Sequence, residues 1–295
     1  MNGVVVINKP QNMTSHDVVA IMRRKLKTKK VGHTGTLDPM ATGVLPVCIG
    51  KATKIVDFIM DRKKAYSCEM VLGASTDTQD QWGQILNVSD IEKSEKEIVD
   101  VILSFVGEIN QIPPMYSAIK QGGEKLVDLA RKGIVVEREP RQRTIYSIDN
   151  IVVRHRTITF NVVCSKGTYI RTLCHDIGVK LGTYAHMTAL NRTLSEPFSL
   201  AQAIDLENLS LENVSNYIQT IEESLAFLPE VRVASSEKLL KLMENGVKVD
   251  FSRFCSVQHD GQFYRFYAGD VFWGVVEKTD QGIFMKKVLV EDDEN

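Results

Sequence analysis

The chain has 295 residues, of which 43% are hydrophobic and 25% charged, and its formal net charge is −1 at pH 7. These values are typical of a soluble globular protein with one large domain or two, and no apolar run is long enough to cross a membrane. The five cysteines are odd in number and form no CxxC pair, which argues against a disulfide framework or a zinc site. Because the N-terminus also lacks the basic segment of a signal peptide, we expect a cytoplasmic protein.

The chain begins with a β-branched run, Val4 to Ile7, which predicts a strand, and a helix over residues 16–26 follows with its N-cap at Thr14-Ser15. The stretch 32–46 contains three glycines, two prolines and three threonines, which excludes a helix and predicts a shaped loop. Within this loop Pro39 biases Asp38 toward an extended backbone, so one carboxylate lies on a stiff segment. The residues alone leave open whether Asp38 has a chemical role or only forms an Asx-turn.

The rest of the chain alternates between strand and helix patterns. Periodic apolar residues predict strands over 45–49, 66–72, 144–154, 157–164 and 185–193, and helices over 52–60, 94–105, 124–132, 206–228 and from within 165–173 to 181. Between them, 73–83 is a polar turn region. Beyond Pro229, a short helix over 237–243, a turn at Asn245-Gly246 and strands over 262–267, 271–278 and 283–290 predict a small β-rich domain.

The charges are distributed unevenly along the chain. Six of the eight residues from Arg23 to Lys30 are basic, and a second basic group comprises Arg131, Lys132, Arg138, Arg141 and Arg143. Acidic residues concentrate in 205–223 and 291–294. We therefore expect a basic face that can neutralise phosphates, although either basic group taken alone can be an ordinary solvated surface.

Several separate segments of this chain resemble the TruB family of tRNA pseudouridine-55 synthases. They are the loop Gly32 to Pro46, the segments Asn8-Lys9-Pro10, Lys64-Ala65-Tyr66, Gln111 to Lys120, and Ser165 to Leu173. The resemblance covers residues 1 to about 205 and implies an α+β fold. Its catalytic domain, 1–229, would surround a mixed, mainly antiparallel β-sheet and carry an RNA-clamping insertion at about 112–142. Residues 230–295 resemble, by pattern, the PUA-like RNA-binding domain of bacterial members.

The resemblance implies that the protein flips uridine 55 out of the TΨC loop of tRNA and isomerises it to pseudouridine. Asp38 would be the essential catalytic residue, as nucleophile or as base at the ribose, with Tyr66 and Arg171 in support. The residues expected to contact the substrate are His33, Tyr66, Tyr169, Leu190 and Lys9, with His33 filling the space that the base vacates. No cofactor or metal is implied. The expected partner is the tRNA T-stem-loop, bound by a monomer without an obligatory protein partner.

Some residues depart from the family pattern or suggest other chemistry. Val127 stands where an aromatic residue is usual, and Asn191, Leu194 and Glu196 replace the usual Arg, Arg and Gly. The sequence Cys174-His175-Asp176 suggests a nucleophile triad, but consecutive helical residues point in different directions. The acids within 73–83 suggest a metal site, although nothing in the sequence fixes them as ligands. The alternative functions are a non-catalytic tRNA-binding or tRNA-folding protein and a guide-dependent RNA pseudouridine synthase.

Overall fold

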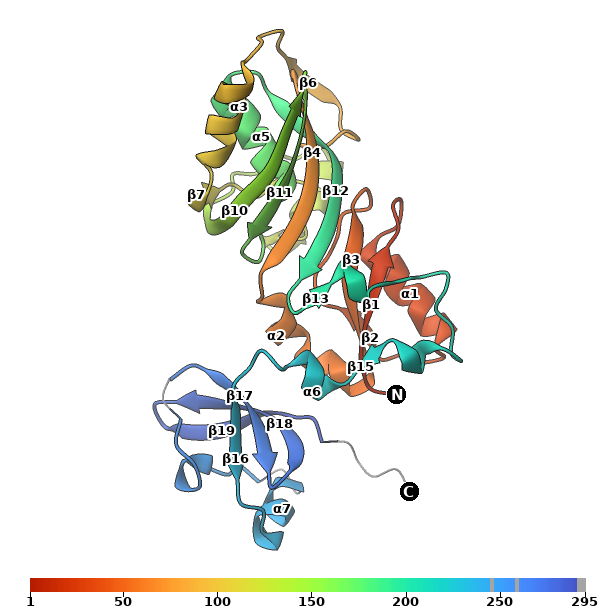
Figure 1. Cartoon of the computed structure of the whole chain (residues 1–295), viewed down its shortest axis with the longest axis vertical. Helices are drawn as coiled ribbons and strands as arrows, with labels where there is room; N and C mark the ends of the chain where they lie inside the picture. The colour runs from red at the N-terminus through yellow and green to blue at the C-terminus, as the bar shows by residue number, and fades with distance from the viewer. Residues whose placement is uncertain (245–246, 258–259, 291–295) are drawn as a thin grey trace.

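The computed structural model describes residues 1–244, 247–257 and 260–290. The turn expected at Asn245-Gly246 and the acidic residues at 291–294 lie outside these described residues. The described chain forms one large sheet with helices against it, and a small sheet that lies at the opposite end of the molecule from the strand β6 (Ile85–Val88) (Figure 1). No helix within the described ranges is long and apolar enough to cross a membrane.

The large sheet is mixed and mainly antiparallel. Its strands are β1 (Gly3–Lys9), β2 (Val31–His33), β3 (Thr42–Ile49), β4 (Lys64–Leu72), β7 (Gly107–Gln111), β10 (Arg141–Arg154), β11 (Thr157–Cys164), β12 (Ala185–Ser195), β13 (Phe198–Ser199), β14 (Ile204–Asp205) and β15 (Ile218–Gln219). The main order is β14-β1-β3-β12-β4-β11-β10-β7, and β2, β13 and β15 pair with β3, β12 and β1. The pairs β1–β14 and β3–β12 are parallel. This arrangement confirms the expected α+β class.

Three longer helices accompany this sheet: α1 (Ser15–Lys25), α3 (Glu95–Leu103) and α5 (Ile170–Leu181). The helix α1 begins as predicted, with a capping box in which Thr14 and Asp17 each accept the other's backbone N–H. The helix α5 ends at Gly182, whose φ of 74° is the left-handed conformation that stops a helix. In Figure 1, α3 and α5 lie together on one side of β10 and β11.

The shorter elements connect this framework. They are the 3-10 helices η1 (Gly50–Ile55), η2 (Leu200–Gln202), η3 (Val214–Asn216) and η4 (Phe251–Arg253), the α-helices α2 (Val56–Met60), α4 (Leu126–Arg131), α6 (Ile221–Ser224) and α7 (Glu237–Glu244), and the strands β5 (Ala74–Thr76), β8 (Lys120–Gln121) and β9 (Glu124–Lys125). The strand β5 pairs with β6, and β8 pairs with β9, so that each pair forms a small separate hairpin.

The small sheet near the C-terminus has the order β16 (Glu230–Val233), β17 (Phe263–Ala268), β18 (Val271–Thr279) and β19 (Gly282–Val288). The three later strands agree with the prediction, whereas β16 was not predicted. An apolar cluster joins this sheet to the large one: Val275 and Leu289 are buried together with Val4 and Val6 of β1. Phe58 of α2 meets Phe263 edge-on, with ring centroids 5.0 Å apart. The division at 229 and the likeness of the small sheet to a PUA domain stay predictions.

Residues 206–228 do not form the helix that their pattern suggested. Only η3 and α6 are helical there, and β15 adds Ile218 and Gln219 to the edge of β1. Leu206, Leu209 and Val214 are buried in the main core from an irregular backbone. The segment therefore covers the edge and one side of β1, and tertiary burial overrides its helical periodicity.

Several other elements differ from the prediction only in their bounds. The strand β3 begins at Thr42, inside the predicted loop, because its pairing with β1 continues to Gly43. The predicted helix 52–60 is split into η1 and α2, and the polar region 73–83 contains β5. The predicted helix 124–132 is shortened to α4 because Glu124 and Lys125 pair with β8.

Candidate active site

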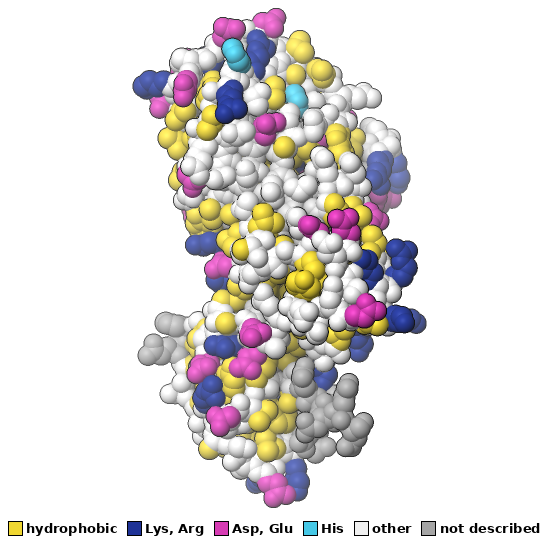
Figure 2. Space-filling model, turned by 45° about the vertical axis from the view of Figure 1, so that its right-hand side comes forward, with side chains coloured by type: hydrophobic (Ala, Val, Ile, Leu, Met, Phe, Trp, Pro, Cys, Tyr) yellow, Lys and Arg dark blue, Asp and Glu magenta, His cyan; other side chains and the backbone are white. Residues whose placement is uncertain are grey.

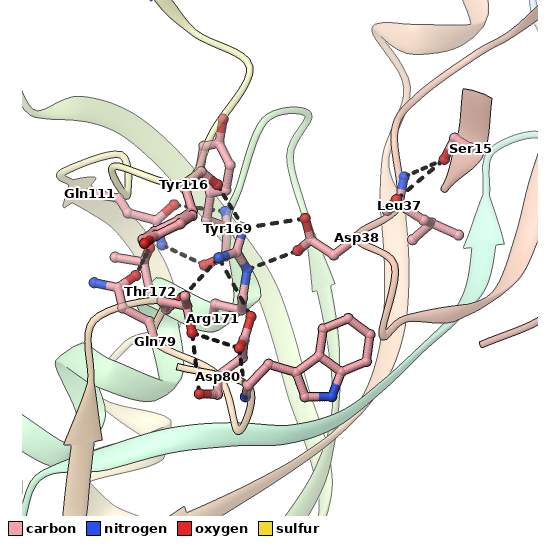
Figure 3. A network of polar contacts seen from close by, with 12 residues as sticks. Ser15, Leu37, Asp38, Gln79, Asp80, Gln111, Tyr116, Tyr169, Arg171 and Thr172 are labelled. Atoms are coloured by element: carbon pink, nitrogen blue, oxygen red, sulfur yellow. Dashed lines mark hydrogen bonds and ion pairs between the residues drawn. The ribbon is translucent and has the colours of Figure 1, made fainter. Parts of the chain in front are cut away.

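Asp38, in the loop before β3, and Arg171, in the first turn of α5, meet although 133 residues separate them in the chain. Arg171 donates from Nε to Asp38 Oδ2 at 2.8 Å and from Nη2 to Asp38 Oδ1 at 3.2 Å, which is a bidentate ion pair. The Arg171 side chain is 5% exposed, whereas that of Asp38 is 36% exposed. The carboxylate is thus held from behind by a buried cation while remaining open to a ligand (Figure 3).

The loop before β3 holds Asp38 rigidly. Ser15 Oγ accepts the Leu37 N–H at 2.9 Å, and Pro39 O accepts the Asn12 N–H at 2.8 Å, so the start of α1 and the turn before it fix both neighbours of Asp38. Figure 3 shows the Ser15–Leu37 contact on the far side of the loop from Arg171. Both carboxylate oxygens of Asp38 accept from Arg171, and among the described contacts neither accepts the Met40 N–H as an Asx-turn would require.

Arg171 has further acceptors beyond Asp38. Its Nη1 donates to Thr78 O at 2.8 Å and its Nη2 to Tyr116 O at 3.0 Å. Asp80 Oδ2 lies 3.7 Å from Nη1, and the Asp80 side chain is 9% exposed. Sequence reasoning treated Asp80 only as part of a doubtful metal site. Its position next to Arg171 depends on contacts across 91 residues of sequence, for which no local signal exists.

Tyr66, Leu190 and Arg192 share one face of the sheet beside this pair. In the antiparallel pairing of β4 with β12, Tyr66 lies opposite Arg192 and Cys68 opposite Leu190. Cys68 Sγ lies 3.5 Å from Cys174 Sγ on α5, the same helix that carries Arg171. The predicted residues Asp38, Tyr66, Arg171 and Leu190 are therefore brought to one region by β4, β12 and α5.

The Tyr66 side chain is a neutral phenol. Burial raises the pKa of Tyr66 to about 12, and the positive charge of Arg192 opposes that rise only in part. Arg192 was not predicted as a site residue. Its side chain is fully buried, and it donates from Nε to Val44 O at 2.7 Å and from Nη2 to Gly35 O at 3.1 Å. Its guanidinium thus ties β12 to the Asp38 loop and supplies a cation behind Tyr66.

His33 and Tyr169 flank the site from two other elements. Burial, together with the nearby charges of His16 and Arg192, lowers the pKa of His33 to about 4, so the ring is neutral at pH 7. Its Nδ1 accepts the Gly35 N–H at 3.3 Å. Tyr169 precedes α5, and Gln111 holds its backbone on both sides, donating to Tyr169 O at 3.0 Å and accepting the Tyr169 N–H at 2.8 Å.

Lys9 is not placed as a substrate contact. Its side chain is fully buried, and its Nζ donates to Pro10 O at 2.8 Å, Met13 O at 2.6 Å and, more weakly, Pro39 O at 3.4 Å. Burial lowers the pKa of Lys9 to about 8. In this conformation Lys9 fixes the backbone around the Asp38 loop from behind, and its expected contact with the substrate stays a prediction.

Two of the unusual residues after Leu190, Asn191 and Glu196, make contacts within the fold. Asn191 stands opposite Thr42 in the parallel pairing of β12 with β3, and a Cβ at Gly43 would collide with the Asn191 side chain and the Arg192 backbone. Gly43 is thus required by close approach of β12. Glu196 accepts from Arg62 Nη2 at 3.0 Å, so this acid is part of a surface ion pair.

The basic group at 23–30 is partly structural. Arg23 donates to Val31 O at 2.9 Å, and Lys25 donates to the carbonyls of Leu206, Glu207 and Leu209 at 2.9, 3.1 and 2.7 Å. Arg24, Lys27, Lys29 and Lys30 are exposed. Figure 2 shows Lys and Arg side chains on the side of the molecule where Figure 1 places α1. Arg23 is exposed as well, so five of the six basic side chains reach the surface, and four of them make no hydrogen bond among the described contacts.

Cys174, His175 and Asp176 do not form a triad. The Cys174 thiol faces Cys68, while burial separately lowers the pKa of His175 and raises that of Asp176 to about 6. The Asp77 and Asp80 carboxylates accept from backbone N–H groups of Gln84 and Trp82. Within the described residues, no group of three or more His, Cys, Asp and Glu side chains is arranged to hold a metal ion.

Asp176→Asn should stabilise the protein at neutral pH. The folded-state pKa of about 6 lies above the usual 3.8, so the folded protein binds more protons than the unfolded chain between about pH 4 and 6. Stability contributed by Asp176 therefore falls as pH rises through this range. At pH 7.5 we expect the Asn variant to be more stable by about 1–2 kcal/mol, reduced from the full shift because the group is partly solvated.

Urea unfolding of both proteins at pH 4 and pH 7.5 measures this difference directly. The two should have nearly equal stability at pH 4, and Asp90→Asn, at an exposed carboxylate, should change little at either pH. An equal gain at both pH values would contradict the assignment to Asp176 ionisation.

Two family profiles match this chain. The profile "TruB family pseudouridylate synthase (N terminal domain)" matches residues 23–170, and "tRNA pseudouridylate synthase B C-terminal domain" matches 171–241. The chain is 50% identical to a curated protein named tRNA pseudouridine synthase B from Clostridium perfringens (strain SM101 / Type A), across 99% of this chain and 100% of that protein. It is 49% identical to the protein of that name from Clostridium tetani, across 98% and 100%.

Two solved structures are similar along nearly the whole chain. One is a Cbf5-Nop10-Gar1 complex, with a TM-score of 0.77 and 28% identity over 99% of this chain and 86% of that chain. The other is an H/ACA RNP bound to a substrate RNA containing 2′-deoxyuridine, with a TM-score of 0.73 and 26% identity over 99% and 86%.

Proposed function

Because the chain belongs to the TruB family of pseudouridylate synthases, we propose that it isomerises uridine 55 in the TΨC loop of tRNA to pseudouridine. The single observation that carries this proposal is the half-exposed Asp38 carboxylate, held by the buried Arg171 and flanked by Tyr66 and Leu190. The relatives that cover the whole chain at about half identity are named for a tRNA substrate.

The reaction breaks the bond from ribose C1′ to N1 of the base, turns the base, and forms a bond from C1′ to C5, while C5 loses its proton and N1 gains one. We propose that Asp38 acts at the ribose, either by attacking C1′ as a nucleophile or by removing a ribose proton as a base. Arg171 orients the carboxylate, since its fork matches both oxygens. The isomerisation changes neither redox state nor atom count, and we propose that no cofactor takes part.

The pocket around Asp38 is suited to a flipped base. Tyr66 and Leu190 present an aromatic ring and an aliphatic side chain from adjacent strands, and Tyr169 approaches from the start of α5. Because the Tyr66 hydroxyl has a pKa of about 12, it is poorly suited to accept the C5 proton, and we assign Tyr66 to packing against the base. The neutral His33 is proposed to occupy the space that the base leaves in the RNA.

The wider RNA contacts are proposed to come from three regions. Arg24, Lys29 and Lys30 near α1 can neutralise phosphates, and Arg141 and Arg143 lie near Tyr169 at the other side of the site. The insertion at about 112–142 would clamp the T-loop, with Gly122 and Gly123 at φ values of 61° and 92° as a flexible turn. The C-terminal sheet would bind RNA as a PUA-like domain.

We propose that the protein acts as a monomer in the cytoplasm without a guide RNA or a second protein. The alternative, a guide-dependent synthase within a protein complex, is favoured by the two similar structures, since one is a complex of three named proteins and the other is an RNP bound to a substrate RNA. Their identity of 28% and 26% is well below the 50% and 49% of the relatives named tRNA pseudouridine synthase B, which favours the tRNA enzyme.

The test is to incubate the purified protein with an unmodified tRNA transcript and no other macromolecule, and to map pseudouridine by chemical labelling and primer extension. We expect one stop, at position 55 in the T-loop. Tight binding without product would support the tRNA-binding or tRNA-folding alternative. Product only after a guide RNA and partner proteins are added would support the guide-dependent alternative.

A further inference from the structure

Trp82 is an exposed aromatic residue that the proposed chemistry does not use. Its side chain lies after the turn that follows β5 and is 51% exposed. The chain has two tryptophans, and the other, Trp273, is 6% exposed in the C-terminal sheet. An indole left half in water loses hydrophobic stabilisation that burial would give. A ligand that covers it would recover that free energy.

A short series of contacts connects Trp82 to the catalytic carboxylate. The Trp82 N–H donates to Asp80 Oδ1 at 3.0 Å, Asp80 Oδ2 lies 3.7 Å from Arg171, and Arg171 pairs with Asp38 at 2.8 Å. Two side chains therefore separate the Trp82 backbone from Asp38. The turn that carries Trp82 therefore adjoins the Arg171–Asp38 pair.

The turn that carries Trp82 is rigid. Gln81, the preceding residue, donates from its backbone N–H to Met187 O at 2.9 Å and from its side chain to Thr188 O at 2.7 Å, both on β12. On the other side, a Cβ at Gly83 would collide with the side chains of Asp77 and Thr78, so a glycine is required there. The indole is consequently presented from a fixed backbone, which lowers the entropy cost of binding.

We propose that Trp82 is a stacking platform for a nucleobase of the RNA substrate, adjacent in the strand to the uridine that enters the Asp38 site. This inference rests on the proposed function. Aromatic side chains stack on unpaired bases of any sequence. Flipping one base removes stacking partners from its neighbours at a cost of a few kcal/mol, and a rigid indole beside the pocket replaces one of those partners.

A different occupant of the same region would be a protein. The adjoining strand β6 exposes Ile85, Leu86 and Val88 at 65%, 62% and 72%, and hydrophobic side chains reach the surface at the end of the molecule where Figure 1 labels β6 (Figure 2). We favour RNA because Trp82 is tied through Asp80 to the Arg171–Asp38 pair, whereas β6 itself has no such link among the described contacts. Self-association is an outcome that the experiment distinguishes.

The first measurement uses Trp82 as its own reporter. Trp273→Phe leaves Trp82 as the single tryptophan, and the Trp273 Nε1 has no described hydrogen-bond partner that the change would strand. Titration with an unmodified tRNA transcript should quench the remaining fluorescence by stacking. No change at saturating RNA would overturn the proposal. A change that follows protein concentration without RNA would assign the region to self-association instead.

The second measurement compares three variants in RNA binding. Trp82→Ala should weaken binding about tenfold, because stacking contributes roughly 1–3 kcal/mol per base, while Trp82→Phe should retain most of the affinity. The dependence of binding on salt should keep its slope, since no cation is removed. Leu86→Ala, an exposed apolar residue on the adjoining strand, is the matched control and should bind as the unchanged protein does.

The outcomes separate this inference from the proposed function. If the unchanged protein forms pseudouridine and Trp82→Ala binds tRNA normally, the stacking role alone is overturned. If Leu86→Ala weakens binding as much as Trp82→Ala, the loss of affinity comes from the apolar hairpin and not from indole stacking. That result would also overturn the stacking role of Trp82. Failure of the unchanged protein to form pseudouridine would instead count against the proposed function.

Discussion

Asp38→Asn is expected to abolish pseudouridine formation while leaving tRNA binding within about threefold of the unchanged protein. The asparagine keeps the size of the side chain and one oxygen acceptor for Arg171, but it can neither attack C1′ nor remove a ribose proton. Loss of the group that performs the bond-breaking step should lower the rate by at least about 10³-fold. Single-turnover conversion of a transcript under excess enzyme measures that rate separately from binding.

The control for Asp38→Asn is a variant that removes a carboxylate elsewhere on the protein. Asp61→Asn removes an acid whose side chain is 64% exposed and which pairs with Lys166 on the surface at 2.6 Å, and its rate should be unchanged. Thermal unfolding should show that both variants remain folded. Conversion by Asp38→Asn at more than a few per cent of the normal rate would remove Asp38 from the catalytic role.

The fold was predictable where the signals are local. The capping box at Thr14 and Asp17 and the alternation along 157–164 each determine an element within a few residues, and both elements are found where expected. The segment 206–228 was not predictable in this way, because its one strand, β15, only completes the edge of β1, where its partners Val4 and Val5 lie near the N-terminus. The strand β16 was missed for the same reason: its partner β17 lies about thirty residues later, and four residues carry little pattern.

The candidate site likewise contains residues that the sequence could identify and residues that it could not. The loop around Asp38 could be identified from its glycines and prolines, and the resemblance then named Arg171 as its partner. The burial of Arg192 could not be foreseen, since an arginine in a strand is ordinarily exposed, and only the approach of β12 to β3 provides the carbonyls that it needs. The burial of Lys9 could not be foreseen for a related reason: its three carbonyl acceptors come from loops whose folded positions are not visible in the sequence.

Arg171→Lys is expected to lower the rate of conversion of bound tRNA by about 10²-fold or more with little change in the dissociation constant. Lysine keeps the charge but cannot reproduce the fork that reaches both Asp38 oxygens and, at the same time, the carbonyls of Thr78 and Tyr116. A misplacement of the carboxylate by about 1 Å is sufficient for a loss of this size. Arg62→Lys, at a surface pair with Glu196, should have no comparable effect.

A second set of variants tests whether the buried Arg171 stabilises the fold by pairing with the Asp80 carboxylate. Arg171→Met leaves the Asp80 carboxylate, 9% exposed, without its cation, and breaking such a pair costs about 3–5 kcal/mol. Adding Asp80→Asn removes the unpaired charge, so the double variant should be more stable than Arg171→Met alone, and a double-mutant cycle measures the coupling.

If Arg171→Lys reduced only the affinity for tRNA and left the rate of conversion of bound tRNA intact, Arg171 would be an RNA-binding residue. Its bidentate contact with Asp38 would then be incidental to the chemistry.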